Sequence, residues 1–136
     1  MRAYIAGPLF NESERWWDEQ IDALAVRAGL ETFLPHRDGK ELNPNPTFED
    51  IFRVNVTNLD GADLVIANLN GVLTDDGTAW EIGYAYARQT PIIGVYTDRR
   101  LTFPGQVVNL MLECSVIKMA RSLDELETLL KDFVNM

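Results

Sequence analysis

Short unbroken apolar runs alternate along the chain with longer segments in which apolar residues recur at every third or fourth position. Such runs are typical of strands buried on both faces of a sheet, and five are present: residues 2–6, 31–34, 64–67, 91–95 and 115–118. The segments between them carry the periodicity of helices. Strands that alternate with helices predict an α/β fold, in which a doubly wound parallel sheet has helices on both faces.

Helix starts are predicted from capping residues. A polar cap followed three residues later by an acid occurs four times: Asn11 with Glu14, Thr47 with Asp50, Thr78 with Glu81, and Ser122 with Glu125. Ser13 competes with Asn11 as the cap of the first helix. Gly29 and Gly61 supply stops for the first two helices.

The helix that begins at Thr47 has an apolar stripe interrupted by one amide. The stripe consists of Phe48, Ile51, Phe52 and Leu59. Asn55 lies inside it, and a polar side chain on an inward face needs a hydrogen-bond partner or a ligand. Asn55 is therefore either a satisfied buried amide or a binding residue.

Three stretches fall outside the regular pattern. Residues 35–46 contain three prolines and Asp38-Gly39, and they are predicted to form a long surface loop of the kind that often binds ligands. Residues 96–105 are predicted to form a second polar loop. The VVNLML segment of residues 107–112 is apolar for a stretch beside a loop.

The composition limits the partners of the chain. With 136 residues it is long enough for one domain, residues 1–136, with a core of its own. A net charge of −9 argues against nucleic-acid binding, which needs clustered Lys and Arg. Cys114 is the only cysteine, so no disulfide forms within the chain. The lack of a leader and of an apolar run near about 18 residues favours a cytoplasmic protein without a membrane span.

The most informative stretch is residues 64–83, LVIANLNGVLTDDGTAWEIG. It leads from a buried strand through a turn into a helix, so Asp75, Asp76 and Glu81 collect at the carboxyl end of a strand, where open α/β sheets bind ligands. Glu81 has two interpretations. It completes a helix cap with Thr78, or it is a nucleophile for an anomeric carbon, kept ionised by the helix dipole. The neighbouring carboxylates favour the nucleophile.

Several common catalytic motifs are absent. The chain has no GxGxxG, Walker or Gly-x-Ser-x-Gly motif, which argues against dinucleotide, P-loop and α/β-hydrolase chemistry. His36 is the only histidine and has no Cys near it in the sequence, so neither a metal site nor a cofactor is expected. Tyr4, in the first strand, is either a core residue or a hydrogen-bond donor to a carboxylate.

Four segments together resemble the nucleoside 2-deoxyribosyltransferase family. They are AYIAGPLF, NLDGADLVIANLNG, DDGTAWEIGYAYARQTPIIGVY and VVNLM, and they extend over nearly the full chain. The Asp-x-Gly-Thr-x-x-Glu-x-Gly-x-Ala pattern of residues 75–85 is the specific part. The resemblance implies a flavodoxin-like order for the sheet of about five parallel strands.

The resemblance also implies an activity. A 2-deoxyribosyl group would pass between nucleobases of 2′-deoxynucleosides by a retaining double displacement, through a covalent intermediate on Glu81, in nucleoside salvage. Tyr4 matches the tyrosine that orients the nucleophile, and Asp75 matches a carboxylate that holds sugar hydroxyls. Asn109 matches an asparagine lent by a neighbouring subunit. A homo-oligomer whose active sites are completed across subunits is therefore implied, with a deoxynucleoside and a free nucleobase as small-molecule partners.

Further substrate-binding residues are expected around Glu81. They are Gly7, Phe10, Asp38, Asn55, Gly77 and Thr78. Asn55 stands where some family members carry an aspartate, and an amide cannot act as a general acid. The leaving base would then take its proton from Asp38, Asp75 or a water. Arg37 and Asp38 are expected to read the base.

Two other functions fit the same residues. A hydrolase of 2′-deoxynucleoside 5′-monophosphates would keep Glu81 and use water as the acceptor. Such an enzyme needs hydroxyl and basic groups at the first loop, where Pro8-Leu9-Phe10 offers neither. A catalytically silent nucleoside-binding module would bind without turnover.

Overall fold

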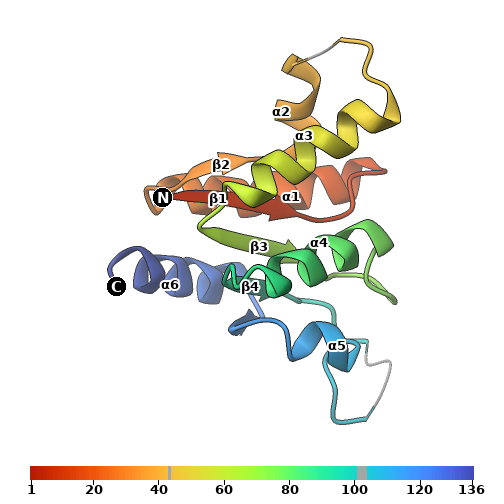
Figure 1. Cartoon of the computed structure of the whole chain (residues 1–136). Coiled ribbons are helices and arrows are strands. Elements are labelled where there is room, and N and C mark those ends of the chain that lie inside the picture. Colours follow the sequence, from red (N-terminus) through yellow and green to blue (C-terminus); the bar gives the residue numbers. More distant parts are fainter. Residues whose placement is uncertain (43, 101–103) are drawn as a thin grey trace.

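The fold is built on one sheet of five parallel strands (Figure 1). The computed structural model describes residues 1–42, 44–100 and 104–136, and it describes residues 40–42 by their backbone alone. The strands are β1 (Arg2–Ala6), β2 (Glu31–Phe33), β3 (Leu64–Asn68), β4 (Ile92–Val95) and β5 (Lys118–Ala120). They lie in the order β2-β1-β3-β4-β5, as the flavodoxin-like prediction requires.

Helices cover both faces of the sheet. They are α1 (Glu12–Arg27), α2 (Pro35–Leu42), α3 (Phe48–Asp60), α4 (Asp76–Ala87), α5 (Leu110–Glu113) and α6 (Leu123–Val134). Side chains alternate along β1, so Ala3 and Ile5 join the core under α1 and α6, whereas Tyr4 and Ala6 join the core under α3 and α4. Figure 1 shows α2 and the start of α3 extending beyond the sheet.

The strand register brings the candidate chemistry to one edge of the sheet. Tyr4 pairs with Phe33 of β2 on one side and with Val65 of β3 on the other. Ala67 of β3 pairs in turn with Gly94 of β4. Because all strands are parallel, the loops that follow β1, β3 and β4 leave from the same carboxyl edge.

Three predicted helix caps are confirmed. The side chains of Asn11, Thr47 and Ser122 accept hydrogen bonds from the backbone N–H three residues later, at 2.8, 3.1 and 3.1 Å. Ser13 lies inside α1 and is not its cap. Gly29 has φ +97° just after α1, a conformation that favours glycine at this position.

The predicted loop at residues 35–46 is wrong, because α2 occupies Pro35–Leu42. Pro35 is the first residue of the helix, where its missing N–H loses no helical bond. The Asp38 carboxylate accepts the N–H of Leu34 at 2.8 Å, immediately before the helix. Proline and an acid in the first turn therefore start a helix here instead of preventing one.

The start of α4 also differs from the prediction. Asp75, not Thr78, is the cap: its Oδ2 accepts the Thr78 N–H at 2.9 Å and the Thr78 hydroxyl at 3.0 Å. The helix therefore begins three residues earlier than predicted, at Asp76. Thr78 is buried in the first turn, and Glu81 lies in the second turn.

The last strand begins later than the predicted range of 115–118. Ser115 follows α5 and is hydrogen-bonded back to it. Its N–H donates to the Leu112 carbonyl at 3.1 Å, and its hydroxyl donates to the Met111 carbonyl at 2.5 Å. The Ile117 N–H then bonds the Ile92 carbonyl at 2.8 Å, which leads into β5.

The second predicted loop, residues 96–105, holds no helix or strand in its described parts. Those parts are residues 96–100 and 104–105, and residues 101–103 lie outside the described residues, as does residue 43 of the first predicted loop. No helix of the described ranges is long and apolar enough to cross a membrane.

Candidate functional site

The centre of the candidate site is a hydrogen bond between a tyrosine of the sheet and a glutamate of a helix. The Tyr4 hydroxyl donates to Oε2 of Glu81, across 77 positions of sequence. Tyr4 is fully buried in β1, and its ring stacks on Phe33 with 5.5 Å between centroids. The phenol is therefore held rigidly against the carboxyl by packing that has nothing to do with a ligand.

Glu81 is a carboxyl with an unusually high proton affinity. Burial raises its pKa from the ordinary 4.5 to about 7, against the effect of the Tyr4 hydrogen bond, and the charges of Asp75 and Asp18 raise it further. The helix dipole was expected to lower this pKa and keep Glu81 ionised, but Glu81 lies in the second turn of α4, and burial raises its pKa instead. Burial and Glu81 also hold the pKa of Tyr4 well above its usual value, so Tyr4 remains a hydrogen-bond donor.

Glu81 lines a cavity of about 520 Å³ at the carboxyl edge of the sheet. Six of the residues predicted to react or to bind substrate line this cavity: Gly7, Phe10, Asn55, Asp75, Gly77 and Glu81. They come from the loop after β1, from α3 and from the start of α4. The parallel topology brings these three segments together, because each borders the same edge of the sheet.

Asp75 has one oxygen engaged and one free of described partners. Its Oδ2 caps α4 through Thr78, whereas its Oδ1 makes no hydrogen bond to another described residue. Asp75 lines the cavity, but Thr78 is 1% exposed and does not. Thr78 therefore acts on the cavity by orienting Asp75.

Asp38 lies away from the cavity, in α2. Its partial burial works to raise its pKa, but the hydrogen bonds from Arg37 and from the Leu34 N–H outweigh burial and hold the pKa below the usual range. Arg37 is also anchored to Asp22 of α1, with 2.8 Å between Nη1 and Oδ2. Neither Arg37 nor Asp38 lines the cavity. Because the pKa of Asp38 is lowered, its carboxyl is ionised at neutral pH and has no proton to give to a leaving base.

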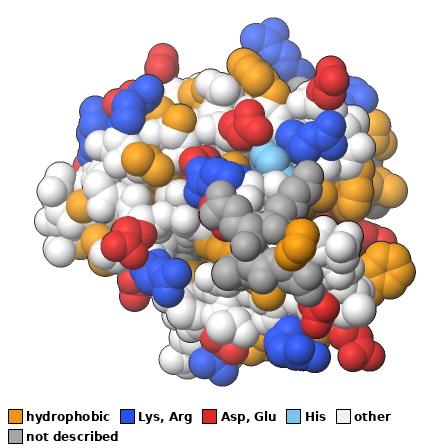
Figure 2. Space-filling view, turned by 90° about the horizontal axis from the view of Figure 1, so that it is seen from above, with side chains coloured by type: hydrophobic (Ala, Val, Ile, Leu, Met, Phe, Trp, Pro, Cys, Tyr) orange, Lys and Arg blue, Asp and Glu red, His pale blue; other side chains and the backbone are white. Residues whose placement is uncertain are grey.

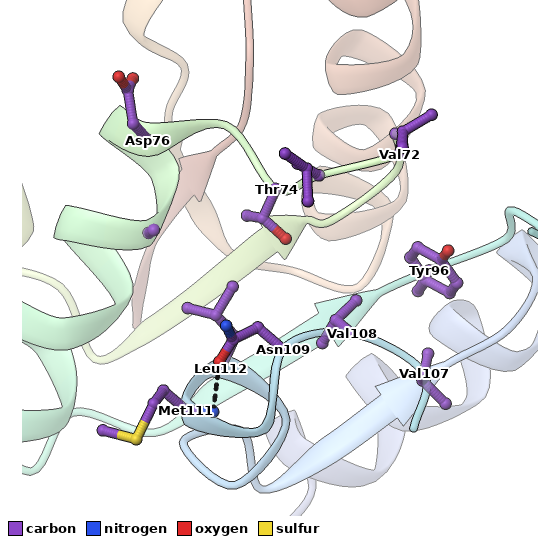
Figure 3. Close-up of a pocket in the computed structure, with 12 residues that line it drawn as sticks. Val72, Thr74, Asp76, Tyr96, Val107, Val108, Asn109, Met111 and Leu112 are labelled. Atoms are coloured by element: carbon purple, nitrogen blue, oxygen red, sulfur yellow. Dashed lines mark hydrogen bonds between the residues drawn. The ribbon is translucent and has the colours of Figure 1, made fainter. Parts of the chain in front are cut away.

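Asn109 lines a different cavity of about 440 Å³, between the loop before α4 and α5 (Figure 3). Its side chain accepts the Met111 N–H at 2.9 Å and so caps α5, as the dashed line in Figure 3 shows. Asn109 is exposed, and the following Leu110 and Met111 are 52% and 71% exposed. Within one chain, Asn109 and Glu81 therefore do not line the same cavity.

An aromatic wall borders the Glu81 cavity. Phe52 of α3 and Trp80 of α4 meet edge to face with 5.6 Å between centroids, and Trp80 stacks on Tyr84 at 5.2 Å. Phe52 and Trp80 line the cavity and are 58% and 47% exposed. The apolar stripe of α3 therefore faces this cavity and solvent, with only Leu59 buried in the core. Trp80 was not among the predicted site residues, although its four-residue spacing from Tyr84 is a signal for a shared face.

A second buried acid, Asp18, also escaped prediction. It lies on α1, is 2% exposed, and accepts a hydrogen bond from Asn68. The signal was present in the sequence, because Asp18 stands three residues before Ile21 and seven before Ala25, on the apolar face of the helix. A charged residue at such a position calls for a buried partner.

The described lining of the Glu81 cavity is uncharged or acidic, and none of these residues is Lys or Arg. The nearby Arg15 lines a neighbouring cavity and donates to the Leu9 carbonyl at 3.0 Å. In the view of Figure 2, Lys and Arg side chains are dispersed among acidic and hydrophobic ones. The cavity thus suits an uncharged ligand better than a phosphate.

The described residues offer no donor set for a metal. No group of three or more His, Cys, Asp and Glu side chains among them is arranged to hold an ion. His36 contacts Glu19 at 3.0 Å and lies outside the Glu81 cavity.

Solved structures with this fold include three enzymes. The 2-deoxyribosyltransferase of Bacillus psychrosaccharolyticus is 22% identical, over 93% of this chain and 90% of that one, with a TM-score of 0.79. The 2-deoxyribosyltransferase of Leishmania mexicana is 24% identical over 98% and 97%, with a TM-score of 0.74. The CMP N-glycosidase BcmB of Clostridium botulinum is 20% identical over 98% and 99%, with a TM-score of 0.66. At these identities the likeness establishes the fold.

Sequence comparison identifies the family. Comparison with curated proteins gives no significant match. The profile of the family described as nucleoside 2-deoxyribosyltransferase matches residues 3–111, a range that contains every residue lining the Glu81 cavity and reaches past Asn109. The enzymes of this family act on nucleosides and nucleobases as small-molecule substrates. The chain belongs to the nucleoside 2-deoxyribosyltransferase family.

Proposed function

We propose that this protein transfers 2-deoxyribosyl groups between the nucleobases of 2′-deoxynucleosides, with residues 1–136 acting as one domain. The observation that carries the proposal is the Glu81 carboxyl, which lines a cavity of about 520 Å³ while the buried Tyr4 holds one of its oxygens. A carboxylate oriented in this way is suited to attack an anomeric carbon.

The reaction consists of two displacements at C1′ of the sugar. Tyr4 holds Oε2 of Glu81, and Oε1 makes no hydrogen bond to another described residue, so Oε1 is the attacking atom. As the Oε1–C1′ bond forms, the bond from C1′ to the base breaks, and the base leaves with the electron pair and takes up a proton. A nitrogen of the second base then attacks C1′, loses a proton, and displaces the Glu81 carboxylate. Two inversions at one carbon retain the β configuration.

Asp75 binds the sugar. Its Oδ2 is held by Thr78, which leaves Oδ1 to accept a hydrogen bond from a sugar hydroxyl. Gly77 lies two residues further on, and a Cβ atom there would lie 3.3 Å from Oδ2 of Asp75, closer than most real contacts. A glycine at this position therefore helps to keep the carboxylate in its capping orientation.

The base lies between apolar and aromatic side chains at the other side of the cavity. Phe10, Ile51, Phe52 and Trp80 supply these walls. Asn55 lines the same region and makes no hydrogen bond to another described residue, so its amide is available to donate to and accept from a base edge. An amide cannot protonate the leaving base and Asp38 lies outside the cavity, which leaves Asp75 or a water as the source of that proton.

Base exchange is the direct test. Incubation with thymidine and adenine should yield deoxyadenosine, and Glu81→Ala should abolish the product. Denaturing the enzyme during turnover and measuring its intact mass should reveal a deoxyribosyl adduct, which Glu81→Ala lacks. Equal rates with uridine would contradict selection for the 2-deoxy sugar, whose missing 2′-hydroxyl favours the oxocarbenium-like transition state.

The same assay separates the alternatives. Release of free deoxyribose phosphate from a 2′-deoxynucleoside 5′-monophosphate without base exchange would assign the chain to the hydrolases. Binding without either reaction would assign a silent nucleoside-binding module. The described lining of the Glu81 cavity contains no Lys or Arg, which supports a nucleoside over a nucleotide as the substrate.

We further propose that the site is completed in a homo-oligomer, where Asn109 of the partner subunit reaches the sugar. Support comes from the family pattern at Asn109 and from the exposed apolar Leu110 and Met111 beside it. Light scattering at micromolar concentration should show an oligomer. A strict monomer that still exchanges bases would contradict this arrangement.

A further inference from the structure

Asp18 is a buried acid that forms no ion pair with any described Lys, Arg or His and does not line the Glu81 cavity. It is 2% exposed, and its described partner is the neutral amide of Asn68, with 2.9 Å between Oδ1 and Nδ2. Asp22, one turn further along α1, is also buried but is paired with Arg37. Burying an acid without a cation costs free energy that an apolar residue would not cost, so Asp18 is a candidate for a role beyond stability.

Asn68 extends this contact into a hydrogen-bonded line along the carboxyl edge of the sheet. It ends β3, and its Oδ1 accepts the Asn70 N–H at 3.0 Å. The Asn70 side chain accepts the Thr97 N–H at 2.7 Å and donates to the Thr97 hydroxyl at 2.8 Å. The line from Asp18 to Thr97 therefore ties α1 to the loops after β3 and β4, and the first of these loops leads to Asp75.

The Asp18 carboxyl packs against Gly7, which is part of the cavity wall. A methyl group at Gly7 would lie 2.6 Å from Oδ1 of Asp18 and 3.0 Å from Cβ of Asn68, so the three residues are packed without spare room. Gly7 itself lines the cavity. A movement of the Asp18 carboxyl toward Gly7 would therefore displace this part of the cavity wall.

Asp18 and Glu81 are also coupled through their charges. Burial raises the pKa of Asp18 to about 7, against the effect of the Asn68 hydrogen bond. The charged groups that raise it further are Glu14, Asp75 and Glu19. The charge of Asp18 in turn raises the pKa of Glu81, which is also about 7. Glu81 therefore loses its proton against the negative charge of Asp18.

We propose that Asp18 is a positioning residue for the reaction at Glu81: through Asn68 and Gly7 it anchors the cavity wall and the loop to Asp75. This first task belongs to the hydrogen bond with Asn68. A second task belongs to the Asp18 charge, which opposes the ionisation of Glu81. This inference rests on the proposed function of Glu81.

Asp18→Asn separates the two tasks, because the amide keeps the shape and the acceptor oxygen but cannot ionise. Asp22→Asn is the matched control, a buried acid on the same helix whose charge does not act on Glu81. Carboxyl-carbon NMR titrations without substrate measure the ionisation of Asp18 and Glu81 in each protein. The pH profile of kcat/KM for thymidine–adenine exchange measures the consequence.

In the wild type, both carboxyl carbons should titrate near neutral pH. Asp18→Asn should move the Glu81 midpoint and the acid limb of kcat/KM to lower pH, because Glu81 no longer ionises against an Asp18 charge. Asp22→Asn should leave the midpoint at its wild-type value. Asp18→Ala removes the hydrogen bond as well, so kcat should fall by about tenfold to a hundredfold across the pH range.

A Glu81 midpoint that is the same in the wild type and Asp18→Asn overturns the proposal, as does a kcat of Asp18→Ala that equals the wild-type value across the pH range. The NMR midpoints need no turnover. A wild type that fails to exchange bases would thus refute the proposed function, while the effect of Asp18→Asn on the Glu81 midpoint is still obtained. If the Asp18 variants do not fold, Asn68→Ala removes the same hydrogen bond, and a wild-type kcat in that variant overturns the anchoring role.

Discussion

Removing the hydroxyl of Tyr4 should shift the ionisation of Glu81. Tyr4→Phe keeps the buried ring and its stack on Phe33, and it deletes the donor to Oε2. A hydrogen bond to a charged group contributes about 1.5–3 kcal/mol, and about 1.4 kcal/mol corresponds to one pKa unit. The Glu81 pKa should therefore rise from about 7 by roughly one to two units.

The assay is the pH dependence of kcat/KM for base exchange. Since the attacking form of Glu81 is ionised, activity at pH 7 should fall by about fivefold to fiftyfold in Tyr4→Phe. The loss should shrink as the pH rises, because alkaline buffer restores the carboxylate. The acid limb of the profile should therefore move to higher pH, opposite to the direction expected for Asp18→Asn.

Tyr84→Phe is the control for this experiment. Tyr84 lies on the same helix, and its hydroxyl donates to Asp60 at 2.6 Å, away from Glu81. Its profile should match that of the wild type. A Tyr4→Phe loss of equal size at every pH would refute the reasoning, because the hydroxyl would then act on the transition state without changing the ionisation of Glu81.

Three further outcomes are expected. Glu81 has a pKa of about 7 in the folded protein and an ordinary value of 4.5, so the unfolding free energy should fall as the pH rises from 4.5 to about 7. Urea denaturation should therefore show Glu81→Gln to be more stable than the wild type at pH 8, by on the order of 2–3 kcal/mol, but not at pH 4. Gly7→Ala should cost about 1–3 kcal/mol and most activity, because its Cβ would lie 2.6 Å from Asp18, whereas Gly83→Ala has open space and should behave as wild type. Mixing inactive Glu81→Ala and Asn109→Ala proteins should restore activity if subunits share sites, and a mixture that stays inactive after subunit exchange would count against shared sites.

Much of the fold could be predicted from local pattern. Four of the five apolar runs became β1 to β4, whereas β5 begins only at the last residue of the fifth run, and the caps at Asn11, Thr47 and Ser122 formed as their spacing predicts. The errors lie where two local rules compete. Pro35 fits a loop, but proline is also common in the first turn of helices. The hydrogen bond from the Leu34 N–H to the Asp38 carboxylate stabilises the start of α2.

The cap of α4 shows the same competition at the candidate site. Asp75 and Thr78 are both good caps, and each has a polar residue three positions later. The structure uses Asp75, so the helix begins three residues earlier and Glu81 lies in its second turn. There the helix dipole has little effect on Glu81, and burial raises its pKa to about 7.

The sequence by itself determined the order of the strands and of α1, α3, α4 and α6, the family, and the motif that carries Asp75 and Glu81, because these depend on neighbours within a few residues. Only the tertiary structure decided how Glu81 is surrounded. The family pattern implies the contact with Tyr4 of β1, but no pattern indicated that Asp18 acts on Glu81 from α1. Burial and charge depend on every group nearby in space, however distant in sequence, and they set the pKa of Glu81 at about 7. No local pattern carries that information.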